Sequence, residues 1–265
     1  MWTTPWVLAV AIAAPMQETT EKDKASAEDL RAAFVELEDE YDAAKSEFWA
    51  EFQRRSEAAD GGSFEWPDPI EPDFYPTFQE IADAGSPDAQ VWCIRNHEHS
   101  GLEGEALITD RMTRYEDVLS ASRDDDLLIS LTWTLQTDLQ MGLVRGQPEQ
   151  SMGKEACFHF LDTIDELAKS DDVRAQSLFA RGSGITPYSA TPEQAAEGLA
   201  FYRKAAELYP ETDTGMRCKG YVFAGENLQI GQKAPDIIGK DHDGNELKLS
   251  DFAGKVTVID FWGFW

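Results

Sequence analysis

Apolar side chains recur every three or four positions along one stretch of the chain, at Leu30, Phe34, Leu37, Tyr41, Ala44, Phe48 and Phe52. This spacing predicts a long amphipathic helix. Ser26 and Asp29 form a capping box that would begin it, and Gly61 with the glycine after it would end it. Glu51 and Arg55 lie one turn apart and are expected to pair. We interpret the apolar seam as a helix–helix contact and the acidic faces beside it as solvated surface.

A proline-rich segment follows over residues 63–75, with the aromatic pairs Phe64/Trp66 and Phe74/Tyr75. Because proline fixes φ and removes a backbone donor, we expect an extended loop whose aromatic side chains hold it to the core. A recognition segment is the alternative. Beyond it, amphipathic stretches separated by turn residues predict eight helices, over residues 77–84, 88–96, 104–120, 126–141, 149–169, 171–181, 192–209 and 213–224.

The clearest of these helices begins after Thr191, an N-cap residue, with Pro192 at its first position. Its continuation over residues 195–210, rich in alanine and ended by proline, resembles the second helix of a tetratricopeptide repeat. A regular period of about 34 residues is absent, so the sequence predicts an irregular array of α-hairpins similar to such repeats. The glycines of Gly182-Ser-Gly184 are expected in a turn between two of the helices.

The last ten residues, 256–265, form an almost wholly apolar run with many β-branched and aromatic side chains. Such a run is typical of a strand buried on both faces, the central parallel strand of an α/β sheet. Asp260 lies in its middle, where burial disfavours the charged form of a carboxyl group. Upstream, Asp243-Gly244 between two β-prone stretches predicts a hairpin over residues 237–249. The alternative, a calcium loop, lacks the required acidic positions.

Four short motifs in this part of the chain occur in the order found in redoxins. The sequence Gly-Gln-Lys-Ala-Pro-Asp at 231–236 resembles their entry segment, and 241–245 resembles their first hairpin turn. Residues 249–255 resemble the loop before the central strand, and 260–265 the strand that leads to the active site. Residues 228–265 therefore resemble the start of a thioredoxin-like domain of the redoxin family, of the TlpA-type or peroxiredoxin-like kind. A chance apolar tail after a hairpin is the alternative.

The resemblance implies a thiol-disulfide oxidoreductase, or an antioxidant peroxiredoxin-like enzyme, that acts on protein thiols and disulfides without a cofactor. In that family the residue after Trp265 would be the first cysteine of Cys-x-x-Cys, and the position of Asp260 helps to move protons for the second cysteine. Asp260 and Trp265 are thus the candidate catalytic positions. Both cysteines would lie beyond residue 265, so the chain as given is predicted to be inactive, and Asp260 within it is interpreted as a strand-end residue without a role.

Composition limits the partners. The formal net charge of −27 argues against nucleic acid and anionic membrane surfaces, and no apolar run approaches the roughly 18 residues of a membrane span. The cysteines Cys93, Cys157 and Cys218 form no Cys-x-x-Cys pair and are interpreted as small buried residues. His97 and His99 have no third ligand beside them, so we expect them in a solvated loop without a metal. The oligomeric state is not specified by the sequence.

Residues 6–14 are apolar and contain an Ala-x-Ala pattern at 11–13, which resembles a secretory signal peptide. A frayed apolar terminus is the alternative. We expect residues 1–15 to be the signal peptide of a protein exported to the periplasm or cell envelope, 16–225 a helical domain, and 226–265 the start of an α/β thioredoxin-like domain, a β-hairpin plus the first central strand. The fold class is mainly α. The functional alternative is a non-enzymatic helical interaction module with a vestigial redox domain.

Overall fold

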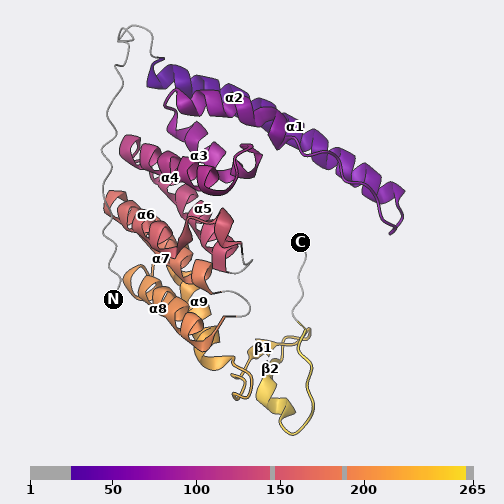
Figure 1. Ribbon diagram of the computed structural model, residues 1–265. Coiled ribbons are helices and arrows are strands. Elements are labelled where there is room, and N and C mark those ends of the chain that lie inside the picture. The colour runs from indigo at the N-terminus through magenta and orange to yellow at the C-terminus, as the bar shows by residue number, and fades with distance from the viewer. Residues whose placement is uncertain (1–24, 144–146, 187–189, 261–265) are drawn as a thin grey trace. The chain divides into compact units, whose positions relative to one another are not determined.

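The computed structural model describes residues 25–143, 147–186 and 190–260 of the chain (Figure 1). These residues are mainly helical and include one two-stranded sheet. They divide into two compact units, the first ending at Ser100 and the second beginning at Gly101. The expected signal peptide lies outside the described residues.

The described part of the first unit consists of α1 Ala27–Ala58, α2 Glu71–Asp83, α3 Pro87–Arg95 and the 3-10 turn η1 His97–His99. The capping box at the start of α1 is confirmed. The Ser26 hydroxyl accepts a hydrogen bond from the Asp29 amide at 3.1 Å, and the Asp29 carboxylate accepts one from the Ser26 amide at 3.2 Å. The predicted seam of α1 packs against α2 and α3, and Phe34 and Tyr41 are buried there.

Aromatic rings form the centre of the first unit. Phe78 of α2 is fully buried and stacks on Trp92 of α3, with ring centroids 3.8 Å apart. Tyr41 of α1 meets the same Trp92 edge-on at 5.5 Å. Stacked and edge-to-face pairs are favourable beyond the apolar area that they bury. The interpretation of the α1 seam as a packing face is therefore confirmed.

The last turns of α1 pack against the loop that follows it. Phe52 lies 5.2 Å from Phe64 and 4.6 Å from Trp66, measured between ring centroids. Arg55 forms the predicted ion pair with Glu51 at 2.7 Å and also donates to the Glu65 carbonyl at 3.2 Å. The loop is held to the helix by aromatic side chains, as expected.

Helix α2 begins six residues before the predicted start at residue 77, so the expectation of an extended loop up to residue 75 is wrong at its end. Pro72 lies in the first turn of α2, where a helix needs no backbone donor. Pro76 lies further inside and removes only the hydrogen bond to the Pro72 carbonyl. Burial of Tyr75 and the 5.4 Å contact of Phe74 with the Tyr41 ring favour the helix in spite of that loss.

The described part of the second unit consists of α4 Gly104–Ala121, α5 Asp125–Leu143, η2 Pro148–Gln150, α6 Gly153–Leu167, α7 Asp171–Ile185, α8 Pro192–Leu208, α9 Asp213–Asn227, β1 Ile238–Lys240, β2 Glu246–Lys248 and η3 Leu249–Phe252. From α5 onward each helix packs against the next one along the chain, and α7 also packs against α5 and α9 (Figure 1). Contacts restricted to near neighbours in sequence are those of a stacked helical array.

Gly182 and Gly184 lie inside α7, so their predicted place in an interhelical turn is wrong. Both glycines permit close helix crossings. A Cβ atom at position 182 would lie 2.8 Å from the Tyr202 ring of α8, and one at position 184 would lie 2.6 Å from Leu139 of α5. The sequence pattern suggested a break because glycine is a poor helix former, whereas tertiary packing requires its small size here.

The segment after α9 forms the predicted hairpin and little else (Figure 1). β1 pairs with β2 in antiparallel register, with Ile238 opposite Lys248. Residues 256–260, the described part of the expected central strand, are exposed and lie outside any strand. A strand buried on both faces requires neighbouring strands and covering helices, and the part of the chain that the structure describes supplies neither.

The described architecture is thus mainly α with a small sheet. The likeness of the helices to tetratricopeptide repeats stays a prediction, as do the domain boundaries 16–225 and 226–265. The division at Ser100 falls inside the first of these ranges. Among the helices that the structure describes, none is both long and apolar enough to cross a membrane.

Candidate functional site

The candidate site is the segment after α9, where the redoxin-like motifs lie. Asp236 ends the first motif, and its carboxylate accepts hydrogen bonds from the amide and the hydroxyl of Ser250, both at 2.8 Å. The bond from the Ser250 side chain, followed by that from its amide, lowers the pKa of Asp236. The Leu249 amide also donates to the Ile237 carbonyl at 3.0 Å. Two motifs separated in the sequence are therefore joined in the structure.

The turn between β1 and β2 is organised by Asp241. Its carboxylate accepts hydrogen bonds from the Asp243 amide at 3.0 Å and from the Asn245 amide at 2.8 Å, and the Asn245 side chain adds a third at 3.1 Å. These bonds, led by that of the Asn245 side chain, lower the pKa of Asp241. Gly244 has φ of 85°, a backbone conformation that favours glycine. The local turn chemistry is sufficient to form the predicted hairpin.

Of the two candidate catalytic positions, the structure describes only Asp260. Asp260 is exposed, so the burial expected from its apolar surroundings is not observed. The neighbouring Val256 and Val258 are 100% and 89% exposed. Trp265 lies outside the described residues. The roles of Asp260 and Trp265 in a dithiol site stay predictions.

The cysteines have the environment expected of structural residues. Cys93, Cys157 and Cys218 are buried and form no disulfide with one another. Burial raises the pKa of the Cys157 thiol, and it raises the pKa of Cys218 to about 11. Because the thiolate is the nucleophile in disulfide exchange, neither of these two thiols is suited to attack a substrate.

A buried polar cluster on α5 was not anticipated from the sequence. Asp138 is 3% exposed, forms an ion pair with Arg111 of α4, and accepts hydrogen bonds from the Ser151 hydroxyl at 2.7 Å and the Met152 amide at 3.0 Å. The Cys157 thiol also donates to it, at 3.3 Å. The signal was present in the sequence, since Asp138 is an acid within the apolar pattern of its helix, as Asp260 is within its own apolar run.

This cluster has a structural role. The Asp138 carboxylate binds the backbone amide of Met152 at the start of α6, where a helix has unpaired donors and attracts negative charge. The Cys157 side chain is fully buried, so its sulfur is shielded from a substrate. The cluster connects α4, α5 and the beginning of α6 by one carboxylate.

His97 and His99 lie in the short turn η1, and His97 is 2% exposed. The expectation that this pair lies in a solvated loop is therefore wrong for His97. η1 packs against α2, a long-range contact that the local sequence does not encode. Among the described residues there is no group of three or more His, Cys, Asp or Glu side chains that could hold a metal ion.

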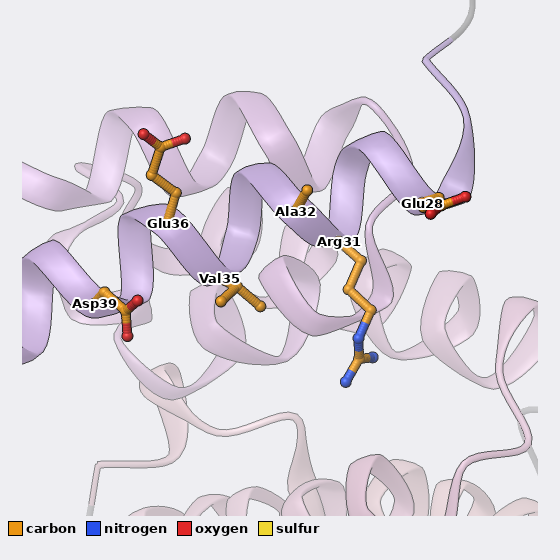
Figure 2. Close-up of a pocket in the computed structure, with 6 residues that line it drawn as sticks. All are labelled: Glu28, Arg31, Ala32, Val35, Glu36 and Asp39. Atoms are coloured by element: carbon orange, nitrogen blue, oxygen red, sulfur yellow. The ribbon is translucent and has the colours of Figure 1, made fainter.

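A shallow cavity of about 530 Å³ lies along α1 in the first unit (Figure 2). Its lining comes from one stripe of that helix, on the side away from the buried seam: Glu28, Arg31, Ala32, Val35, Glu36 and Asp39. The single arginine is paired with Asp88 at 3.4 Å. Three carboxylates beside one exposed valine provide no convergent set of groups for catalysis or for ligand binding.

Comparison with known proteins gives short local matches. The chain is 38% identical over 47 residues to the thiol-disulfide oxidoreductase ResA of Bacillus thuringiensis, which is 18% of this chain and 27% of that protein. It is 42% identical over 45 residues to ResA of Bacillus subtilis, 17% of this chain and 25% of the relative. The match to ResA of Geobacillus kaustophilus is 42% over 38 residues, 14% and 22% of the two chains. No family model and no solved structure matches the chain.

These relatives support a relationship of part of the chain to the thioredoxin-like family and to thiol-disulfide oxidoreductases. The chain spans about a quarter of the length of the curated relatives that it matches. The relationship that these matches support therefore concerns a short segment of the chain.

Proposed function

We propose that this chain is part of a thiol-disulfide oxidoreductase and that residues 228–265 form the first part of its thioredoxin-like domain. The observation that carries the proposal is the 38% identity over 47 residues to a protein of that name. We place the matched stretch at the C-terminal end of the chain, where it would include residues 228–265 and the end of α9, because the four redoxin-like motifs lie after α9 in the family's order. The Asp236–Ser250 hydrogen bonds support this placement, since they join two of those motifs.

In the complete domain the apolar residues that follow η3 would form the central strand. Asp260 would then be covered and would assist proton transfer to the resolving cysteine, and Trp265 would precede the attacking cysteine. The substrates would be protein thiols or disulfides. The protein would be exported, with residues 1–15 as its signal peptide. The helical units, an array of α-hairpins similar to tetratricopeptide repeats, would present the redox domain to its partners.

A second candidate function is a non-enzymatic interaction module. It is favoured by the burial of the cysteines and by the absence of a Cys-x-x-Cys pair from the sequence. Under this alternative the segment after α9 is the remnant of a redox domain, and the helices alone carry the function.

The coding sequence downstream of Trp265 discriminates between the two. We expect a Cys-x-x-Cys pair directly after this residue, and we expect the protein extended by its natural downstream sequence to reduce insulin with dithiothreitol as the electron source. The 265-residue chain and an extended protein with both new cysteines replaced by serine are the controls, and both should stay at the buffer rate. A stop codon after Trp265, or an extended protein without turnover, would favour the interaction module.

A further inference from the structure

An arginine and three aromatic side chains from α5, α7 and α9 form one surface of the second unit. We call it the Arg217 face, made of Trp133, Phe179, Arg217 and Tyr221. The guanidinium carbon of Arg217 lies 4.0 Å from the centroid of the Phe179 ring and 5.8 Å from that of Trp133. Phe179 lies 6.3 Å from Trp133 and 5.8 Å from Tyr221, measured between centroids. The cation is thus stacked on one ring and flanked by the other two.

The parts of this face that a ligand can reach are the guanidinium and the two outer rings. Trp133 is 44% exposed and Tyr221 is 46% exposed, whereas Phe179 is only 5% exposed. Arg217 itself is exposed. Stacking on an aromatic ring holds a guanidinium in place while its N–H groups stay available at the edge.

Hydrogen-bond donors exceed acceptors on the Arg217 face. Among the described residues, no carboxylate lies within ion-pair distance of Arg217, although the nearby Arg203 pairs with Glu226 at 2.8 Å. Arg217 donates to the Gln176 Oε1 atom at 3.2 Å. Gln176 is 4% exposed, and its Nε2 atom has no hydrogen-bond partner in the described part of the chain. Arg217 is thus an exposed cation bonded to a neutral amide oxygen and to no carboxylate among the described residues, which favours an acidic ligand in spite of the negative net charge of the chain.

We propose that the Arg217 face binds an extended segment of another protein in which an acidic side chain is flanked by apolar ones. The carboxylate would accept hydrogen bonds from Arg217, and the apolar side chains would lie against Trp133 and Tyr221. Trp133 lies 6.3 Å and Tyr221 lies 5.8 Å from Phe179, so a segment of roughly four residues of extended chain, at about 3.3 Å per residue, is long enough to reach both outer rings. Side chains at positions i, i+2 and i+4 of such a segment point to the same side.

The acidic group is a side chain rather than a chain terminus. Terminal carboxylates are captured by clusters of backbone N–H groups, and Arg217 lies within α9, beyond its first turn. The inference is independent of the redox proposal, because these four residues lie outside residues 228–265.

The test uses the complete chain and a labelled pentapeptide with blocked ends, which has glutamate at its centre, leucine at both ends and serine between. Fluorescence anisotropy measures its binding at low salt. We expect saturable binding that is weakened roughly fivefold by Arg217→Gln, the upper end of an exposed ion pair, and weakened to a similar degree when glutamine replaces glutamate in the peptide. Because Arg217 is exposed, its replacement leaves the core intact, which circular dichroism verifies.

Arg203→Gln is the matched control: it removes an exposed arginine of the same unit that is already paired with a carboxylate, and it should leave binding unchanged. Trp133→Ser should weaken binding of both peptides equally, since it removes apolar contact alone. Equal binding of the glutamate and glutamine peptides, or an Arg217→Gln variant that binds like the original chain, would overturn the proposal. Absence of binding up to millimolar peptide would overturn it too. A dimer that Arg217→Gln converts to a monomer in sedimentation would assign the face to a second copy of this chain instead.

Discussion

Apolar side chains have opposite environments in α7 and in the segment after α9. In α7 the side chains of Val173, Leu178 and Ile185 are buried, because α5, α6, α8 and α9 surround the helix. After α9, Ile230, Val256 and other apolar residues are exposed to solvent. Both stretches contain large aliphatic side chains of the kind that form protein cores. The difference teaches that such side chains are buried only where other helices or strands are present to cover them. In the described chain, the helices have such partners and the segment after α9 does not.

The first test of this comparison is a substitution in the core of the first unit. Phe78→Ala should lower the free energy of unfolding of the first unit by about 3–5 kcal/mol, because it removes a fully buried ring stacked on Trp92 and leaves a cavity. Val258→Ala should change the free energy of unfolding of the second unit, to which it belongs, by less than about 0.5 kcal/mol, since that side chain is 89% exposed. Urea denaturation followed by circular dichroism measures both. A cost of Val258→Ala near that of Phe78→Ala would mean that the segment after α9 is packed.

The buried polar cluster gives a second large effect. Asp138→Asn should destabilise the second unit by about 3 kcal/mol, because it leaves the charge of Arg111 without its buried partner. Glu197→Gln breaks the exposed pair with Lys154 and should cost at most about 1 kcal/mol. Thermal melts of the two variants compare a buried ion pair with an exposed one in the same unit. Equal costs would contradict a stabilising role for Asp138.

Removal of the segment after α9 tests the same comparison. We expect a small change in stability and a larger change in solubility. A chain that ends at Asn227 should keep its helical circular dichroism spectrum and melt within about 2 °C of the original, since most of the described side chains after α9 are exposed. Its solubility should rise, because exposed apolar stretches promote aggregation. A spectrum of random coil, or a melting temperature lower by ten degrees, would show that the segment supports the helices.

The smallest effect is a local titration in the segment itself. The hydrogen bonds from Ser250 lower the pKa of Asp236. Their contribution to stability is therefore fully present above the ordinary carboxyl pKa and is lost as the pH falls through the lowered pKa. Ser250→Ala should raise the pKa of Asp236 toward its ordinary value, because it removes the hydrogen bond from the Ser250 hydroxyl to the Asp236 carboxylate. NMR titration of the side-chain carboxyl carbons measures this shift. Asp241 is the internal control, since Asn245 lowers its pKa and is untouched.

Local signals in the sequence were sufficient for much of this structure. The capping box at Ser26 and the N-cap at Thr191 were readable because each is formed within four residues. The Asp243-Gly244 hairpin forms for the same reason, from a turn that organises its own backbone. Long-range packing decided the rest. It places Gly182 inside a helix and buries His97, and the local sequence around these two residues predicts neither result.

In the candidate site, too, local features could be predicted from the sequence and long-range ones could not. The motifs that end at Asp236 and begin at Leu249 could be read from the sequence, and the structure joins them. The expected burial of Asp260 is not observed, because it depends on strands that the described residues do not provide. Asp138 could have been recognised by the argument applied to Asp260, but its partners Arg111 and Ser151 come from other elements.

We propose that the apolar residues after η3 are those of a sheet strand and that the described helices do not cover them. Hydrogen exchange of the backbone amides, read by mass spectrometry on the intact 265-residue chain, tests it most directly. We predict strong protection of α5 and α7, slight protection of the hairpin, and exchange at the rate of an unstructured peptide for residues 257–260. Protection of residues 257–260 as strong as that of α7 would contradict the claim, because it would require a covering partner within this chain.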